Sequence, residues 1–170
     1  MQTVLITGAN GFIGQYLSRL LLQKGFTVIA TGKGDSRLPF NHPQLVYETL
    51  DFTQAAAVTE KIKKHQPNII VHAGALSKPD ACELDKQTAF LINVSGTQHL
   101  LGAAQQSRAF FVYLSTVFVF EGCQLHYKEE DELKPVNYYG ETKMMAENEV
   151  KKYAWGWSIV RTILVYGHPC

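Results

Sequence analysis

The sequence predicts an α/β protein built on a doubly wound, parallel sheet. Apolar segments rich in β-branched residues alternate with segments whose apolar residues recur at helical spacing, which is typical of βαβ units. A glycine-rich turn also follows the first apolar segment and opens the first helical one. The length of 170 residues suits one domain with a sizeable core, so we expect residues 1–170 to form a single domain.

The elements can be placed in order along the chain from these patterns. Strands are expected at residues 3–7, 27–31, 45–48, 69–73, 110–115 and 158–161. Helices are expected between them, at residues 13–24, 54–65, 85–106 and 139–153. The acidic stretch 121–137 is predicted to be a long loop, and loops of that length in a compact domain are usually functional or mobile.

Composition limits the classes of partner and the compartment. The net charge of +1 gives no broad field for capturing nucleic acid or a membrane surface, and we expect neither partner. The N-terminus lacks a basic leader, and no apolar run approaches the roughly 20 residues that span a bilayer. Cys82, Cys123 and Cys170 lie far apart, and neither they nor the six histidines have metal-ligand spacing. We therefore expect a cytoplasmic protein with free thiols and without a structural metal.

The turn TGANGFIG, residues 7–14, carries the first chemical signal. Its glycines, Gly8, Gly11 and Gly14, follow a predicted strand and open a predicted helix. Glycines could serve only the tight connection, but in this position backbone N–H groups at the helix N-terminus would face an anion such as a pyrophosphate. The turn predicts dinucleotide binding, and the intervening residues are expected to contact the cofactor: Asn10, Phe12 and Ile13.

The end of the second strand indicates which nicotinamide cofactor is preferred. An acidic residue there would bind the free ribose of NAD, whereas basic residues accommodate the 2′-phosphate of NADP. The expected strand end is Gly32, and Lys33 and Arg37 follow it closely, which favours NADP. Asp35 keeps NAD open as an alternative if the strand extends further than expected.

A candidate catalytic set lies at the end of the predicted strand 110–115 and on the predicted helix 139–153. Tyr139 and Lys143 are four residues apart and share one face of a helix, where the ammonium could stabilise a phenolate. A Tyr-x-x-x-Lys pair occurs by chance in many helices, but here Ser115 and Thr116 end a strand at the sheet edge where α/β proteins bind ligands. Hydroxyl, phenol and ammonium could then converge on one reacting oxygen.

Together these motifs resemble the extended short-chain dehydrogenase/reductase family. The segments LSTVFVFEG (114–122) and PVNYYGETKMMAE (135–147) are similar to its dTDP-4-dehydrorhamnose reductase branch. The resemblance implies a Rossmann fold and a catalytic set of Thr116, Tyr139 and Lys143, with Lys143 also on the nicotinamide ribose. It implies further cofactor contacts from a set of residues at strand ends and on the third predicted helix: Asp51, Phe52, Ala73, Gly74, Ala75 and Asn93. For Asn93, a structural role in helix packing is the equal alternative.

The resemblance also sets the expected activity and its alternatives. It implies NADP-dependent reduction of a 4-keto nucleotide sugar, by a protein that could form a homodimer. Val117 and Phe118 stand where the branch commonly has Asp and Tyr, which leaves the sugar open. Family members continue past a V-Y-G segment, here residues 165–167, into a sugar-binding region, so that region is expected to be largely absent from this chain. A nucleotide-sugar epimerase or dehydratase, and a non-catalytic NADP-binding regulatory subunit, remain as alternatives.

Overall fold

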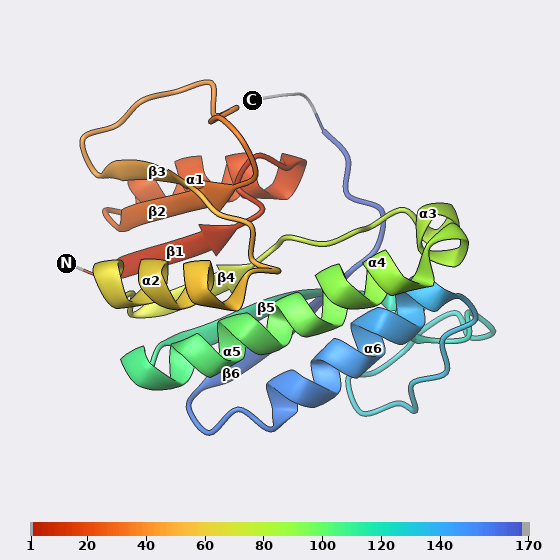
Figure 1. The fold of residues 1–170 in the computed structure, drawn as a ribbon. Helices are drawn as coiled ribbons and strands as arrows, with labels where there is room; N and C mark the ends of the chain where they lie inside the picture. Colours follow the sequence, from red (N-terminus) through yellow and green to blue (C-terminus); the bar gives the residue numbers. More distant parts are fainter. Residues whose placement is uncertain (1, 168–170) are drawn as a thin grey trace.

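The computed structural model describes residues 2–167, which contain one six-stranded sheet (Figure 1). Every strand pairing is parallel, and the spatial order is β3-β2-β1-β4-β5-β6. The strands are β1 (Thr3–Thr7), β2 (Thr27–Gly32), β3 (Leu45–Thr49), β4 (Ile69–His72), β5 (Phe110–Thr116) and β6 (Trp157–Thr162). The chain winds outward from β1 in one direction and from β4 in the other, so the doubly wound Rossmann fold is confirmed.

Helices cover both faces of the sheet. Figure 1 shows α2, α5 and α6 in front of the strands and α1 behind them. The helical segments are α1 (Phe12–Gln23), α2 (Ala55–His65), α3 (Pro79–Leu84), α4 (Lys86–Phe90), the π-helical η1 (Leu91–Ser95), α5 (Gly96–Ser107), the 3-10 turn η2 (Val117–Val119) and α6 (Tyr138–Lys151). This two-sided cover is what an all-parallel sheet requires.

The core has two parts because successive strand residues point to opposite faces. In β1, Leu5 packs in the cluster under α2, α5 and α6, whereas Val4 and Ile6 pack in the cluster under α1. The same division holds for β5, where Phe111 and Tyr113 are fully buried beneath the three front helices. The strands are thereby fixed in register, and their carboxyl ends meet along one edge of the sheet.

The connection between β4 and β5 differs in two ways from the sequence-based expectation. The predicted helix 85–106 is interrupted at Leu91–Ser95, where the backbone takes a π-helical turn between α4 and α5. The short helix α3 was not expected; it begins at Pro79, a residue well suited to the first helical position because it needs no N–H partner there. Between β2 and β3, where no helix was predicted, the connecting chain packs Leu38 and Phe40 against the α1 side of the sheet.

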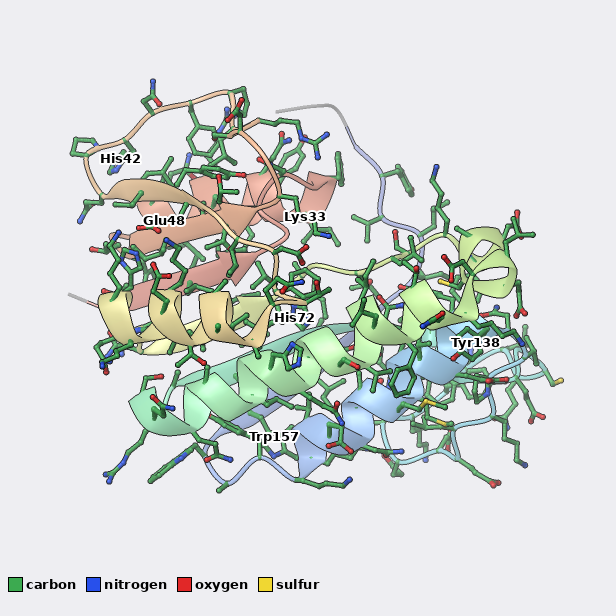
Figure 2. All side chains as sticks on the ribbon, in the orientation of Figure 1. Lys33, His42, Glu48, His72, Tyr138 and Trp157 are labelled. Carbon is green, nitrogen blue, oxygen red and sulfur yellow. The ribbon has the colours of Figure 1, made fainter. Side chains whose placement is uncertain are left out.

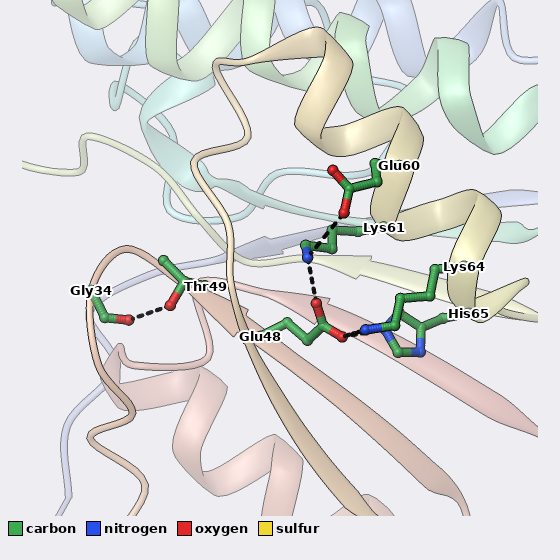
Figure 3. Close-up of polar contacts among 7 residues, drawn as sticks. All are labelled: Gly34, Glu48, Thr49, Glu60, Lys61, Lys64 and His65. Carbon is green, nitrogen blue, oxygen red and sulfur yellow. Dashed lines mark hydrogen bonds and ion pairs between the residues drawn. The ribbon is translucent and has the colours of Figure 1, made fainter.

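Salt bridges join the edge strand β3 to α2 (Figure 3). The Glu48 carboxylate pairs with the ammonium groups of Lys61 and Lys64 and with the His65 ring. Hydrogen bonds from Lys61 and then Lys64 lower the pKa of Glu48 to about 2, so it stays ionised at any physiological pH. Charged side chains on an edge strand also discourage pairing with other chains.

Residues 2–167 can be searched for membrane-spanning helices, clusters of metal ligands and free thiols. None of the helices within residues 2–167 is long and apolar enough to cross a membrane. The same residues contain no cluster of three or more His, Cys, Asp or Glu side chains that could hold a metal ion. Cys82 is buried and Cys123 is exposed, both as free thiols, and Cys170 lies outside the described residues.

Candidate functional site

A cleft of about 510 Å³ opens where β1 and β4 lie side by side at the carboxyl edge of the sheet. This is the point at which the strand order reverses, where open α/β sheets bind their ligands. Predicted site residues that line it are Gly8, Asn10, Gly11, Phe12, Ile13, Gly14, Lys33, Arg37, Phe52, Ala73, Gly74, Ala75, Tyr139 and Lys143. A larger hollow of about 970 Å³ beside β6 contains none of them. The structure thus brings residues from five separate parts of the chain to one cleft.

The glycine turn is built for close approach. Gly8 has φ +71°, a left-handed conformation that favours glycine. A Cβ on Gly14 would lie 2.3 Å from the Gly8 carbonyl oxygen, so only glycine lets α1 begin this close to the turn. No side chain caps the α1 N-terminus at Gly11, which leaves its first-turn N–H groups directed at the cleft.

The loop after β2 places two cations at the cleft. The strand ends at Gly32, and both Lys33 and Arg37 line the cleft. Asp35 is not among the lining residues, so the condition under which it would favour NAD, a longer strand, is not met. Asp51, outside the lining, pairs through Oδ2 with Lys33 Nζ at 2.8 Å. Its contact with the cofactor remains a prediction.

Tyr139 and Thr116 meet beside the cleft. Tyr139 lies in the first turn of α6, whose N-cap, Asn137, accepts a hydrogen bond from Gly140 N at 2.8 Å. Burial raises the pKa of the Tyr139 phenol, and a hydrogen bond with the Thr116 hydroxyl partly offsets that rise. Thr116 ends β5, is almost fully buried, and does not itself line the cleft. The pair can hold a proton at the phenol oxygen in neutral solution.

Lys143 is a buried amine one helical turn beyond Tyr139. Only 2% of it is exposed, and its Nζ donates to the Leu114 carbonyl oxygen at 2.7 Å. The Nζ also lies 4.0 Å from the centre of the Tyr113 ring, a cation–π contact. Burial lowers the pKa of Lys143 to about 7, although the Glu147 carboxylate acts in the opposite direction. Lys143 therefore gains or loses its charge near neutral pH.

This depressed pKa predicts that the protein becomes more stable as the pH rises from about 7 to about 9. An unfolded lysine has a pKa of about 10.4, so in this window the unfolded chain binds more protons than the folded one. We expect the free energy of unfolding to rise by about 1 kcal/mol per pH unit. Urea denaturation at a series of pH values measures this slope.

The variant Lys143→Met isolates the contribution of the buried amine. It should flatten the pH dependence in this window, whereas Lys151→Met, on the exposed side of the same helix, should keep the parental slope. An unchanged slope in Lys143→Met would show that other groups cause it.

A buried chain of hydrogen bonds lies beneath the cleft. Thr97 Oγ1 donates to the Asn93 carbonyl oxygen at 2.7 Å, so it accepts from His72 Nε2 at 3.1 Å. The other ring nitrogen, Nδ1, accepts from Thr7 Oγ1 at 2.6 Å. Burial, and then the charge of Lys143, holds the pKa of His72 well below its usual range. His72, drawn in the interior in Figure 2, is a neutral core residue that joins β1 to the helical layer.

Asn93 continues this chain towards α6. Its side-chain oxygen accepts from Leu76 N at 2.8 Å, and its Nδ2 donates to Thr142 Oγ1 at 3.0 Å. Thr142 in turn donates to the Tyr139 carbonyl oxygen at 2.8 Å. Asn93 is 1% exposed and does not line the cleft, so its contacts here join η1 to α6, and its role at the cofactor remains a prediction.

Several lining residues were not expected from the sequence. They are Gly32, Leu50, Thr53, Ser77, Ile92, Leu114, Thr162 and Val165, whereas Ser115, expected with Thr116 at this sheet edge, also lines the cleft. The rule that strand ends meet at one edge could have found Thr162, which ends β6, whereas nothing in the sequence signals Ile92 in the π-helical turn. Ser115 is 4% exposed, and its hydroxyl has no hydrogen-bond partner among the described residues. A buried unpaired hydroxyl at a cleft is a ready contact for a ligand.

Comparison with known proteins decides the family. The RmlD substrate binding domain family matches residues 1–169. The chain belongs to this family. Proteins that resemble the chain include methionine adenosyltransferase 2 subunit beta of Xenopus tropicalis, 32% identical over 96% of this chain and 47% of that protein. Another is the spore coat polysaccharide biosynthesis protein SpsK of Bacillus subtilis, 32% identical over 99% of this chain and 55% of that protein.

Solved structures agree with the RmlD assignment. The dTDP-4-dehydrorhamnose reductase of Bacillus anthracis, solved in complex with NADP, is 32% identical and superposes with a TM-score of 0.84. The match covers 98% of this chain and 55% of that one. The chain thus spans about half the length of the curated relatives it matches. The expected likeness to the dTDP-4-dehydrorhamnose reductase branch is confirmed.

Proposed function

We propose that this chain supplies the cofactor site and the catalytic residues of an NADP-dependent reductase that acts on a 4-keto nucleotide sugar. In this proposal residues 1–170 are an NAD(P)-binding Rossmann domain. One observation carries it: a single cleft holds the uncapped glycine turn, two cations and the Tyr139 and Lys143 pair. The reductase complexed with NADP, at 32% identity, supports both the cofactor and the class of substrate.

The residues at the cleft fit a dinucleotide. A Cβ at Gly8 or Gly14 would collide with backbone atoms, so these glycines let the turn pack closely enough for α1 to begin at the cleft, where its N–H groups suit a pyrophosphate. Lys33 and Arg37 suit a 2′-phosphate, and the unpaired Ser115 hydroxyl suits a polar group deeper in the cleft. When bound, NADPH would supply the hydride for the reduction.

The chain's own residues handle the proton. Tyr139 donates its phenolic proton to the sugar oxygen as the C4 carbonyl becomes an alcohol, and Thr116 orients the phenol through their hydrogen bond. The positive charge of Lys143, four residues along α6, lowers the cost of the phenolate that remains. Burial keeps this phenol protonated until the substrate oxygen becomes basic.

The test is consumption of NADPH with a 4-keto nucleotide sugar such as dTDP-4-dehydrorhamnose. We expect one NADPH oxidised for each sugar reduced, followed by the loss of NADPH absorbance and by analysis of the sugar product. Interconversion of sugars without net oxidation of NADPH would instead favour an epimerase or dehydratase, the alternative supported by epimerase-like neighbours.

A regulatory subunit is the second candidate. Several relatives at 31–32% identity are methionine adenosyltransferase 2 beta subunits, and Val117 and Phe118 depart from the reductase pattern. Phe118 is 44% exposed, and its ring lies edge-on to Tyr139, with ring centres 6.0 Å apart, where the reductase branch commonly has Tyr. Tight NADP binding without turnover of any keto sugar, together with co-purification of a partner enzyme, would support this candidate over the reductase.

A further inference from the structure

The Asn10 side chain joins the glycine turn to the loop after β2. It is only 8% exposed, and its Oδ1 accepts a hydrogen bond from Arg37 N at 2.8 Å. Its Nδ2 donates to the Asp35 carbonyl oxygen at 3.0 Å and to the Tyr47 hydroxyl at 2.8 Å. Tyr47 donates in turn to the Gly34 carbonyl oxygen at 3.0 Å. We call Asn10 and Tyr47, with the backbone of residues 33–37 that they hold, the Asn10 clamp.

The clamp is closely packed on its other sides. A Cβ on Gly32 would lie 3.1 Å from both Asn10 Nδ2 and the Tyr47 hydroxyl, so glycine at the end of β2 leaves room for the amide. Thr49 on β3 donates to the Gly34 carbonyl oxygen at 3.1 Å (Figure 3). The loop is therefore held by side chains from the glycine turn and from β3, and not by its own sequence alone.

The held loop carries the two cations that face the cleft. Arg37 is anchored at its own N–H, and the carbonyl oxygen of Lys33 lies 3.4 Å from Asn10 Nδ2. Lys33 is in Figure 2 at the carboxyl end of β2, and 62% of its side chain is exposed. Ordering a loop and two long side chains costs conformational entropy. Lys33 and Arg37 therefore bind a phosphate between them more tightly if their backbone is already ordered before the ligand arrives.

We propose that Asn10 is a positioning residue that sets the spacing of Lys33 and Arg37 and so makes the protein prefer a 2′-phosphorylated dinucleotide to an unphosphorylated one. The inference rests on the proposed NADP-binding function. A side-chain amide suits this role because it accepts from Arg37 N and donates to Asp35 O at once, which neither a carboxylate nor an ammonium can do. Asn10 thus acts on the 2′-phosphate through Arg37 and Lys33.

The experiment measures dissociation constants for NADP and for NAD by calorimetry in the parent protein and in Asn10→Ala. We expect Asn10→Ala to weaken NADP roughly tenfold, because it removes hydrogen bonds that each contribute modestly. NAD, which lacks the 2′-phosphate, should change by less than about threefold. Ser36→Ala is the matched control, because Ser36 lies in the same loop and its hydroxyl accepts a hydrogen bond from Leu38 N, outside the clamp.

A double-mutant cycle with Arg37→Ala tests whether the amide acts through the guanidinium. If it does, Asn10→Ala should cost little further NADP affinity once Arg37 is gone, since the two changes remove one interaction. Full additivity of the two losses would overturn the proposal. An equal loss for NADP and NAD in Asn10→Ala would also overturn it, because the amide would then serve only the glycine turn.

Two further outcomes keep the proposals separate. If Asn10→Ala does not fold, Tyr47→Phe, which removes one clamp hydroxyl, is measured in the same way, and an unchanged ratio of NADP to NAD affinity overturns the clamp. If the parent protein binds neither dinucleotide, the proposed function itself fails. If it binds NADP and the ratio is unchanged in the clamp variants, only this inference fails.

Discussion

Replacing Tyr139 with phenylalanine is expected to abolish sugar reduction while NADP binding stays nearly unchanged. The substitution removes only the phenolic hydroxyl, the group proposed to donate the proton. The ring stays packed against Phe118 and against the buried side chains of Cys82 and Ala89. Loss of a positioned general acid typically lowers the rate by roughly 10²- to 10⁴-fold. The measurements are kcat with a 4-keto nucleotide sugar and the dissociation constant for NADP.

Tyr138 provides the matched control for this experiment. It precedes Tyr139 in α6, but its ring contacts the Lys86 ammonium on the outside of the fold, and its N–H donates to Glu83 (Figure 2). Tyr138→Phe should therefore keep the parental turnover. Unchanged turnover in Tyr139→Phe would refute the proposed mechanism, and a parallel loss of NADP affinity would point to a structural effect.

The largest effect on stability is expected from Arg161→Leu. The Arg161 guanidinium binds the fully buried Glu147 carboxylate in two places, Nε to Oε1 at 3.0 Å and Nη2 to Oε2 at 2.7 Å. Its Nη1 also donates to the Glu129 carbonyl oxygen in the acidic loop at 3.1 Å. Removing the arginine leaves a buried charge without its partner, which typically costs about 3–5 kcal/mol. Urea denaturation measures the loss in unfolding free energy.

Removing both charges separates the cost of the unpaired carboxylate from the value of the pair. The double variant Glu147→Leu/Arg161→Leu should recover much of the lost stability, because apolar residues of similar volume often replace a buried ion pair at little cost. A loss below about 1 kcal/mol in Arg161→Leu would contradict this prediction and show that the ion pair contributes little to stability.

The sequence was informative wherever local pattern and tertiary structure agree. The apolar run of Val4, Leu5 and Ile6 predicted a buried parallel strand, and β1 has the predicted bounds. Strands β2, β3, β4 and β5 differ from expectation by one residue at one end, and β6 differs by one residue at each end. The central strands are predictable because burial on both faces gives them nearly unbroken apolar runs. Tyr139 and Lys143 line the same cleft because their spacing matches one helical turn, a purely local rule.

Features that depend on distant contacts could not be predicted in this way. The bonds from Asn10 reach residues 25 to 37 positions away, so no local pattern reveals that its amide holds a loop. Ser115 and Thr116 are adjacent hydroxyls, and only the three-dimensional register shows that Ser115 lines the cleft while Thr116 contacts Tyr139. The Glu147–Arg161 pair likewise joins a helix to a strand that the sequence separates.

The π-helical turn η1 lets the continuous helix formed by α4, η1 and α5 pack against two different parts of the fold. An α-helix advances about 100° per residue, so the one extra residue in a π turn rotates everything beyond it by about that angle. Before the turn, Ala89 faces Tyr139 and Cys82 beside the cleft; beyond it, Leu100 and Ala104 face the core shared with α2. Without this phase shift a regular helix could satisfy only one of those faces. Deleting a single residue there would therefore turn either the Ala89 face away from Tyr139 or the Leu100 face away from the core, although every other side chain of the helix would be unchanged.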